Sequence, residues 1–210
     1  MDRLGVQPAP VALKKALLSK IEREMKLGSA GLIQFKMNAL EDVQVTRALY
    51  LAAHAGVKVQ LIVRDTCRLR PGVVGVSENI RVISIVGRFL EHGRIYYFRN
   101  GGAEEYFIGS ADCMKRNLES RVEVIAPIED PLLRKDLRTI LDIQLSTRRG
   151  AWELRSDGSY IRLAPANDLS PSAQELLTAF ADKKLSVSER QRRRKIARRR
   201  NLVTQQPEIP

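Results

Sequence analysis

Several kinds of residue are scarce in this chain of 210 amino acids, and each scarcity excludes a class of protein. Two cysteines, Cys67 and Cys113, are too few for a disulfide framework and lack the spacing of metal ligands. No apolar run approaches the roughly 18 residues of a membrane span, and MDRLGVQPAP at the N-terminus contains no apolar segment of an export signal. We therefore expect a cytoplasmic protein with reduced thiols, no transmembrane segment and no metal site of its own.

Signatures of common nucleotide-binding and hydrolytic enzymes are missing as well. The chain contains no GxxxxGK[ST] loop, no GxGxxG sequence after a strand and no GxSxG turn. Gly101 and Gly102 fit a turn between two strands better than a loop that cradles phosphate. Histidine is limited to His54 and His92. These two positions are therefore the first to consider for chemistry that needs an imidazole.

Apolar residues, by contrast, make up 44% of the chain, which is enough for a folded core. The net charge is +12, and residues 183–210 carry +8 of it through ten Lys or Arg and two acidic side chains. The run ERQRRRKIARRR, at 189–200, has almost no apolar residues and cannot bury a face. We predict one domain over 1–182 and a basic tail over 183–210, either disordered or a solvated helix. The tail has no dedicated ligand, or it contacts a polyanion.

The body of the chain alternates the patterns that are typical of helices and strands. Helices are predicted over 11–27, 40–55, 131–145 and 172–183, and strands over 32–37, 57–63, 80–86, 94–98, 105–109, 121–127 and 159–163. Asn38 is expected to cap the second helix, and Asp130 the third, with Pro131 at its first position. The strand–helix–strand order predicts a parallel pair in an α/β sheet, and Asn100 with its two glycines predicts a hairpin.

Polar side chains are expected to gather at one edge of this sheet. Ligands of parallel α/β sheets collect at the carboxyl ends of the strands, and a hairpin brings the start of its first strand beside the end of its second. This reasoning brings together Arg64, His92, Arg94, Ser110, Asp112, Lys115 and Arg116. The expected site is one imidazole surrounded by guanidinium and ammonium groups, with Asp112 as the only acidic residue of its loop.

Such a site suits an anion, because Arg offers paired donors to phosphate and stays charged at any working pH. A neutral imidazole can attack phosphorus or donate a proton to a leaving oxygen. The alternative for His92 is a structural histidine at the entrance of a strand. His54, in the predicted helix LYLAAHAG, is expected to be structural.

Long stretches of the sequence resemble one family. KMNALED (36–42), GVKVQLIVRDTCRLRPGVVGVSENIRVISIVGRFLEHGRIYYF (56–98), IGSADCMKRNLESRVEVIAPIEDP (108–131) and DGSYIRLAP (157–165) resemble the C-terminal part of bacterial polyphosphate kinase. That enzyme moves phosphate between ATP and polyphosphate. The resemblance covers residues 4 to about 165, and it implies a phospholipase D-like α/β fold, with a mixed sheet and flanking helices. We also expect a homo-oligomer.

The resemblance implies roles for individual residues. Arg64 matches an ATP-contacting Arg at the end of a strand, His92 a His before a hairpin, and Arg121 a basic residue that faces the phosphates. His92 is the expected catalytic residue, as an acid, base or charge stabiliser. The expected binding site for ATP and polyphosphate consists of Arg64, His92, Arg94, Lys115, Arg116 and Arg121.

The phospholipase D pattern itself, His-x-Lys followed by Asp, is only partly kept. Arg94 replaces the Lys, and Arg99 stands where the Asp is expected. A phosphodiester-cleaving nuclease is therefore the least favoured hypothesis.

In the polyphosphate kinase family the phosphorylated histidine lies in the preceding domain, with the Mg²⁺-linked arginines and a nucleotide-contacting tyrosine. No residue here takes those roles. We therefore expect an expressed fragment, a truncated gene product or one part of a split enzyme with a separate upstream kinase chain, inactive alone. The expected ligands are ATP or ADP and polyphosphate, with Mg²⁺ held by the missing domain. The hypothesis is a C-terminal catalytic domain of a polyphosphate kinase; the alternative is a non-enzymatic module that binds polyphosphate or nucleic acid.

Overall fold

The computed structural model describes residues 7–10, 12–167 and 169–203, and the side chains of these residues except 7 and 189–203. The chain divides into two compact units, Met1–Ala173 and Gln174–Pro210. The second unit contains nearly all of helix α5 (Ala173–Val203), which includes the basic run of the sequence. The unit boundary precedes the predicted one at 182, and the division into a domain and a tail stays a prediction. None of the described helices is long and apolar enough to cross a membrane.

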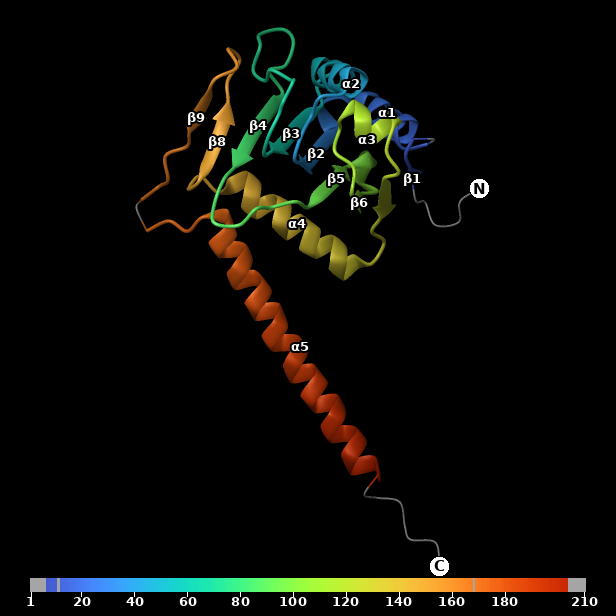
Figure 1. Cartoon of the computed structure of the whole chain (residues 1–210), viewed down its shortest axis with the longest axis vertical. Helices are drawn as coiled ribbons and strands as arrows, with labels where there is room; N and C mark the ends of the chain where they lie inside the picture. Colours follow the sequence, from blue (N-terminus) through green and yellow to red (C-terminus); the bar gives the residue numbers. More distant parts are fainter. Residues whose placement is uncertain (1–6, 11, 168, 204–210) are drawn as a thin grey trace, which may run out of the picture. The chain divides into compact units, whose positions relative to one another are not determined.

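A mixed sheet forms the first unit (Figure 1). In the described residues its strands are ordered β1-β7-β6-β5-β2-β3-β4-β8-β9. Neighbours pair antiparallel except β2 with β3 and β3 with β4, which confirms the predicted parallel pair. The strands are β1 (Gln7–Pro8), β2 (Leu32–Met37), β3 (Lys58–Val63), β4 (Ile80–Ile85), β5 (Arg94–Phe98), β6 (Glu105–Gly109), β7 (Val124–Pro127), β8 (Ala151–Leu154) and β9 (Tyr160–Arg162).

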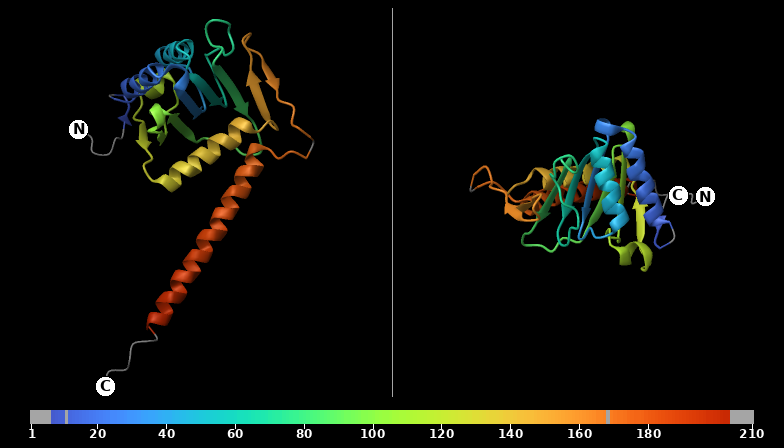
Figure 2. Two further views of the ribbon diagram at one scale, coloured as in Figure 1. Left: turned by 180° about the vertical axis from the view of Figure 1, so that it is seen from behind. Right: turned by 90° about the horizontal axis from the view of Figure 1, so that it is seen from above.

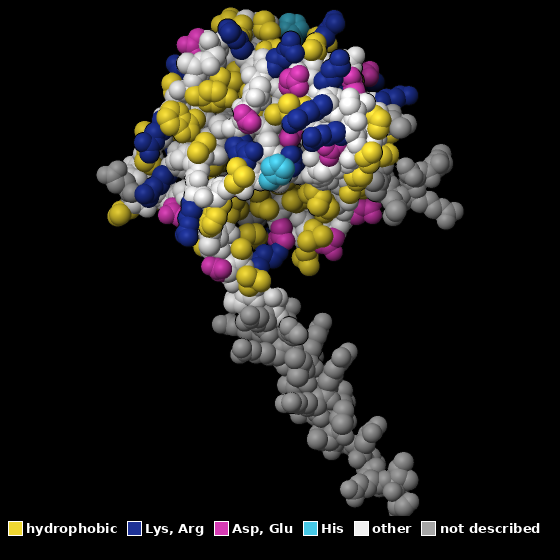
Figure 3. All heavy atoms as spheres, viewed as in Figure 1, with side chains coloured by type: hydrophobic (Ala, Val, Ile, Leu, Met, Phe, Trp, Pro, Cys, Tyr) yellow, Lys and Arg dark blue, Asp and Glu magenta, His cyan; other side chains and the backbone are white. Residues whose placement is uncertain are grey.

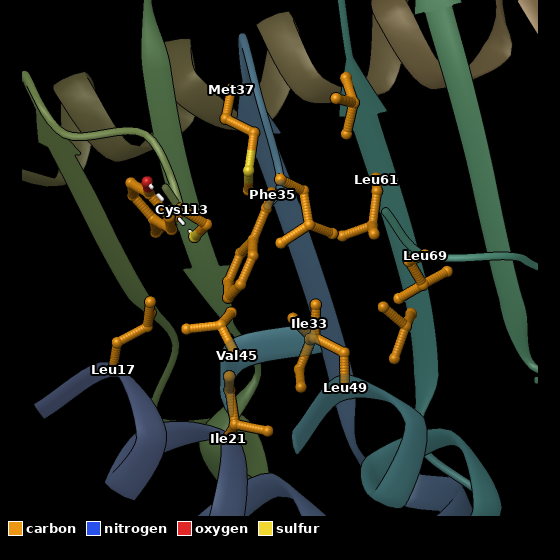
Figure 4. Close-up of a cluster of buried hydrophobic side chains, with 14 of the residues drawn as sticks. Leu17, Ile21, Ile33, Phe35, Met37, Val45, Leu49, Leu61, Leu69 and Cys113 are labelled. Carbon is orange, nitrogen blue, oxygen red and sulfur yellow. Dashed lines mark hydrogen bonds between the residues drawn. The ribbon is translucent and has the colours of Figure 1, made fainter. Parts of the chain in front are cut away.

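Helices cover both faces of the sheet (Figure 2). α1 (Leu13–Met25) and α2 (Val43–His54) lie on one face, and α4 (Pro131–Ser146) lies on the other. The first face buries a core to which α1, α2 and the strands contribute Leu17, Ile21, Val45, Leu49, Ile33, Phe35 and Leu61 (Figure 4). The second buries Leu141 of α4 against Ile62, Ile83 and Tyr97. Each such side chain contributes about 1.5–3 kcal/mol on burial, so the two layers hold the strand ends in place.

The residues that cap the N-termini of α4 and α2 agree with the sequence-based prediction for one helix and not for the other. Asp130 caps α4 as predicted, accepting hydrogen bonds from the backbone N–H of Leu132 at 2.8 Å and of Leu133 at 3.0 Å. The prediction for Asn38 was wrong, because α2 begins at Val43 and is capped by Asp42.

Two short strands and one short α-helix were not predicted, β1, β8 and α3 (Lys115–Glu119), nor were the 3-10 helices η1 (Gly28–Ala30) and η2 (Asn100–Gly102). They span two to five residues each, which is too short for a periodic pattern.

Candidate functional site

A pocket of about 480 Å³ opens where β2 and β3 end and β5 begins. The end of β6 and the start of β7 complete it, because Arg94 pairs with Gly109 and Gly109 with Ile125. The lining residues are Asn38, Ala39, Arg64, Asp65, Thr66, His92, Arg94, Ser110, Asp112, Met114, Arg116, Asn117, Arg121 and Glu123. The hairpin therefore brings His92 and Ser110 to one pocket, as predicted.

Most of the basic residues singled out from the sequence reach this pocket. Arg64, Arg94, Arg116 and Arg121 line it together with His92. Lys115, the first residue of α3, is exposed and is not among the lining residues. The geometry thus brings five of the six predicted side chains together, whereas their binding of ATP or polyphosphate stays a prediction.

Arg64 is positioned by the loop that leads to His92. Its Nη1 donates to the carbonyl oxygen of Glu91 at 2.9 Å. The carboxylate of Glu91 accepts in turn from Nζ of Lys36 at 2.7 Å and from Nε2 of Gln144, on α4, at 2.5 Å. Ordered neighbours lower the entropy that a guanidinium loses when it binds a ligand.

Arg94 forms a buried ion pair beneath His92. The exposed fractions of Arg94 and Asp112 are 8% and 6%. Nε and Nη2 of Arg94 donate to the two oxygens of Asp112 at 3.1 and 2.8 Å, a bidentate arrangement. Nη1 donates to the carbonyl oxygen of His92 at 2.8 Å and lies 2.8 Å from Nδ1 of the imidazole. His92 itself is exposed at the rim of the pocket.

Burial raises the pKa of Asp112, but hydrogen bonds from Arg94 and from the backbone N–H of Asn38 outweigh it, so the pKa lies below its ordinary value of 3.8. A carboxyl with a lowered folded-state pKa stabilises the fold above the ordinary value, and this contribution is lost as pH falls through the folded-state pKa. We compare the two proteins as the pH falls from the ordinary pKa of Asp112 through its lowered folded-state pKa. Over this interval the free energy of unfolding should decrease less for Asp112→Asn than for the original protein. Urea unfolding at a series of acidic pH values measures this, and superimposable pH profiles would contradict it.

A second buried carboxylate, Glu123, accepts hydrogen bonds from the hydroxyl of Ser110 and from Nδ2 of Asn117, the latter at 2.6 Å. The Ser110 hydroxyl also accepts from the backbone N–H of Val124 at 3.2 Å. Gly109 is required beside it, because a Cβ there would clash with the carbonyl oxygen of Val124. Ser110 is therefore engaged in holding β6 against β7.

Five polar lining residues were not predicted from the sequence: Asn38, Asp65, Thr66, Asn117 and Glu123. Glu123 carried a signal, since a carboxylate inside an otherwise apolar strand pattern needs a partner when it is buried. Its partners lie on other elements and could not be read from the sequence.

Two guanidinium groups of the pocket are free to meet a ligand. Arg116 and Arg121 are exposed, and no hydrogen bond or ion pair joins their side chains to another residue that the structure describes. Basic side chains lie beside and above an exposed histidine on the face in Figure 3. Four arginines and three carboxylates, those of Asp65, Asp112 and Glu123, line the pocket, so the ionised side chains leave a small positive excess that suits an anion.

The side chains of this pocket do not form a metal site by themselves. The described residues contain no group of three or more His, Cys, Asp or Glu side chains that could hold one. Asp112 and Glu123 already accept hydrogen bonds from protein donors. Asp65 is the one lining carboxylate for which the structure describes no hydrogen bond, and a single carboxylate falls short of a metal site formed by the protein alone.

The family described as "Polyphosphate kinase C-terminal domain 2" matches residues 6–174, a range that contains every lining residue of the pocket. The chain belongs to this family. The match extends the range of resemblance seen in the sequence to the end of the first unit.

Individual relatives agree with this assignment. A polyphosphate kinase of Synechocystis sp. is 53% identical over 177 residues, covering 82% of this chain and 24% of the relative. A polyphosphate kinase of Pseudomonas aeruginosa is 50% identical over 166 residues, covering 78% of this chain and 24% of the relative. The chain thus spans about a quarter of the length of these curated relatives.

Solved structures confirm the fold. A polyphosphate kinase from Porphyromonas gingivalis superposes with a TM-score of 0.81 at 39% identity, covering 87% of this chain and 28% of that one. The phospholipase D family member Nuc from Salmonella typhimurium superposes with a TM-score of 0.55 at 15% identity, covering 73% of this chain and 98% of that one. The predicted phospholipase D-like mixed sheet with flanking helices is therefore confirmed.

Proposed function

We propose that this chain is the C-terminal catalytic part of a polyphosphate kinase, and that its pocket binds the phosphates of ATP and polyphosphate during reversible transfer of the ATP terminal phosphate. The observation that carries the proposal is an exposed imidazole at a pocket with three available arginines, Arg64, Arg116 and Arg121. Phosphoryl transfer needs chiefly positioning and neutralisation of charge, which these groups supply.

In this proposal Arg64 and Arg121 hold the phosphate chain, with Arg116 beside them. His92 donates a hydrogen bond or a proton to the transferred group and is not its covalent carrier. Mg²⁺ that accompanies the nucleotide is held chiefly by residues outside this chain, since the described residues contain no group of three or more His, Cys, Asp or Glu side chains that could hold it. The 210 residues alone then bind phosphates without turnover.

The alternative of a non-enzymatic polyanion-binding module uses the same arginines. The two hypotheses differ in His92, because binding through charge tolerates its loss and catalysis does not. The available arginines are common to both, so a binding experiment tests the pocket and a turnover experiment tests the enzyme.

We expect Arg121→Ala to weaken tripolyphosphate binding by about 1 kcal/mol, roughly fivefold, because an exposed charged contact is screened by solvent. Isothermal titration of the purified chain measures it. Arg162→Ala is the matched control, since Arg162 is an exposed Arg on β9, at the far end of the strand order from β7. Equal affinities for the two variants, or no binding by the original chain, would contradict a phosphate site in this pocket.

A further inference from the structure

Arg94 has no donor nitrogen left for a ligand. Its Nε and Nη2 donate to Asp112, and its Nη1 donates to the carbonyl oxygen of His92. A phosphate that bound Arg94 would have to displace a buried carboxylate or the chain at His92. With an exposed fraction of only 8%, its guanidinium is also poorly placed for a ligand in the open pocket.

The contacts of Arg94 with the imidazole select one state of the ring. A guanidinium can only donate, so the Nη1 to Nδ1 contact at 2.8 Å uses the lone pair of Nδ1. The second approach, Nη2 to Nε2, is longer at 3.3 Å. A neutral imidazole that accepts at Nδ1 carries its hydrogen on Nε2, and this N–H is a donor that a phosphate oxygen can accept.

Asp112 is itself anchored to a different part of the sheet. One of its oxygens accepts from the backbone N–H of Asn38 at 2.7 Å, just beyond the end of β2. Asp112 follows β6, and Arg94 begins β5. The ion pair thus fixes the ring and backbone of His92 relative to three strands.

Stability alone does not account for a buried ion pair of this kind. Removing two charges from water costs free energy that their attraction only partly returns, and apolar residues of similar volume often serve a fold as well or better. A buried ion pair can instead orient a functional group, and for that purpose its fixed geometry matters more than its net effect on stability.

We propose that Arg94 and Asp112 are positioning residues: Asp112 fixes Arg94, and Arg94 holds His92 in the tautomer with hydrogen on Nε2 without binding phosphate itself. The proposal rests on the proposed function, since it matters only if His92 acts on phosphate. It revises the sequence-based hypothesis that Arg94 is a phosphate ligand.

Nitrogen NMR of the ¹⁵N-histidine-labelled chain tests the tautomer directly. The sequence has only two histidines, so His54→Gln assigns both imidazoles. At mildly alkaline pH we expect His92 to show the distinct shifts of one neutral tautomer, protonated at Nε2. In Asp112→Asn and in Arg94→Lys we expect the shifts to move toward the average of two exchanging tautomers. Arg94→Lys keeps the positive charge but loses the paired N–H donors of the guanidinium. It therefore tests the proposal even if the Asp112 variant does not fold.

Titration with tripolyphosphate separates positioning from binding. We expect Arg94→Lys to change the affinity by less than about threefold, whereas Arg64→Ala, which removes a half-buried arginine proposed to hold phosphate, should cost about tenfold or more. Unchanged His92 shifts in both folded variants would overturn the proposal, as would a tenfold loss of affinity in Arg94→Lys. If the original chain binds no tripolyphosphate but shows the single tautomer, the proposed function fails and the positioning of His92 stands.

Discussion

Replacing His92 by alanine should lower ATP-dependent polyphosphate synthesis by at least about 100-fold, the lower end of what a positioned acid–base group contributes. The assay uses a protein of full family length, because this chain spans about a quarter of the length of its curated relatives. A suitable protein is a chimera in which this chain replaces the matching part of the Synechocystis relative, to which it is 53% identical. Synthesis is measured as polyphosphate formed from ATP in the presence of Mg²⁺.

The chain offers a matched control for this substitution. His54, the last residue of α2, is an exposed histidine whose Nδ1 lies 3.3 Å from the carbonyl oxygen of Gly75. It does not line the pocket. His54→Ala should therefore keep the original rate, and His92→Ala should still bind tripolyphosphate. Synthesis at the original rate by His92→Ala would exclude a catalytic role and favour a binding module.

Replacing Arg64 by alanine should weaken binding of ATP and tripolyphosphate by about 1.5–3 kcal/mol, or roughly 10- to 150-fold. The expected loss is larger than for Arg121, because Arg64 is half-buried and its guanidinium is held by the carbonyl oxygen of Glu91. The affinity of Arg64→Lys should lie between those of the original chain and Arg64→Ala, because an ammonium keeps the charge but loses the paired donors of a guanidinium. Titration calorimetry with the 210-residue chain gives all three affinities.

Arg68 is the matched control for Arg64. It lies in the same loop, is exposed, and makes only a long contact of 3.4 Å to the carbonyl oxygen of Glu41 among the hydrogen bonds of the described residues. It does not line the pocket. If Arg68→Ala weakened binding as much as Arg64→Ala, general charge attraction would explain the affinity better than a defined site.

The place of the site could be predicted because it depends on local patterns. Apolar runs located β2, β3 and the β5–β6 hairpin, and the polar residues that follow or precede them then meet at one edge. Arg64 and His92 reached the predicted pocket through this reasoning alone. Strand direction and order are enough to place a residue, even when nothing is known of its side chain.

The partners of those side chains could not be predicted in the same way. Asp112 meets both Arg94, on another strand, and the backbone of Asn38, 74 positions away in the chain. Such contacts depend on rotamers and on the packing of several elements, which no local pattern contains. The sequence therefore listed Arg94 with the phosphate ligands, and the structure shows its donors directed to protein groups.

The link from Gln144 through Glu91 to Arg64 limits how the site could be moved to another protein. Glu91 connects α4 and β2, on one side, to the guanidinium of Arg64 on the other. Grafting the pocket loops onto a foreign sheet would leave the carboxylate of Glu91 without Gln144, and the loop before His92 would lose its tether. A working transplant would have to include α4, although that helix contributes no lining residue to the pocket.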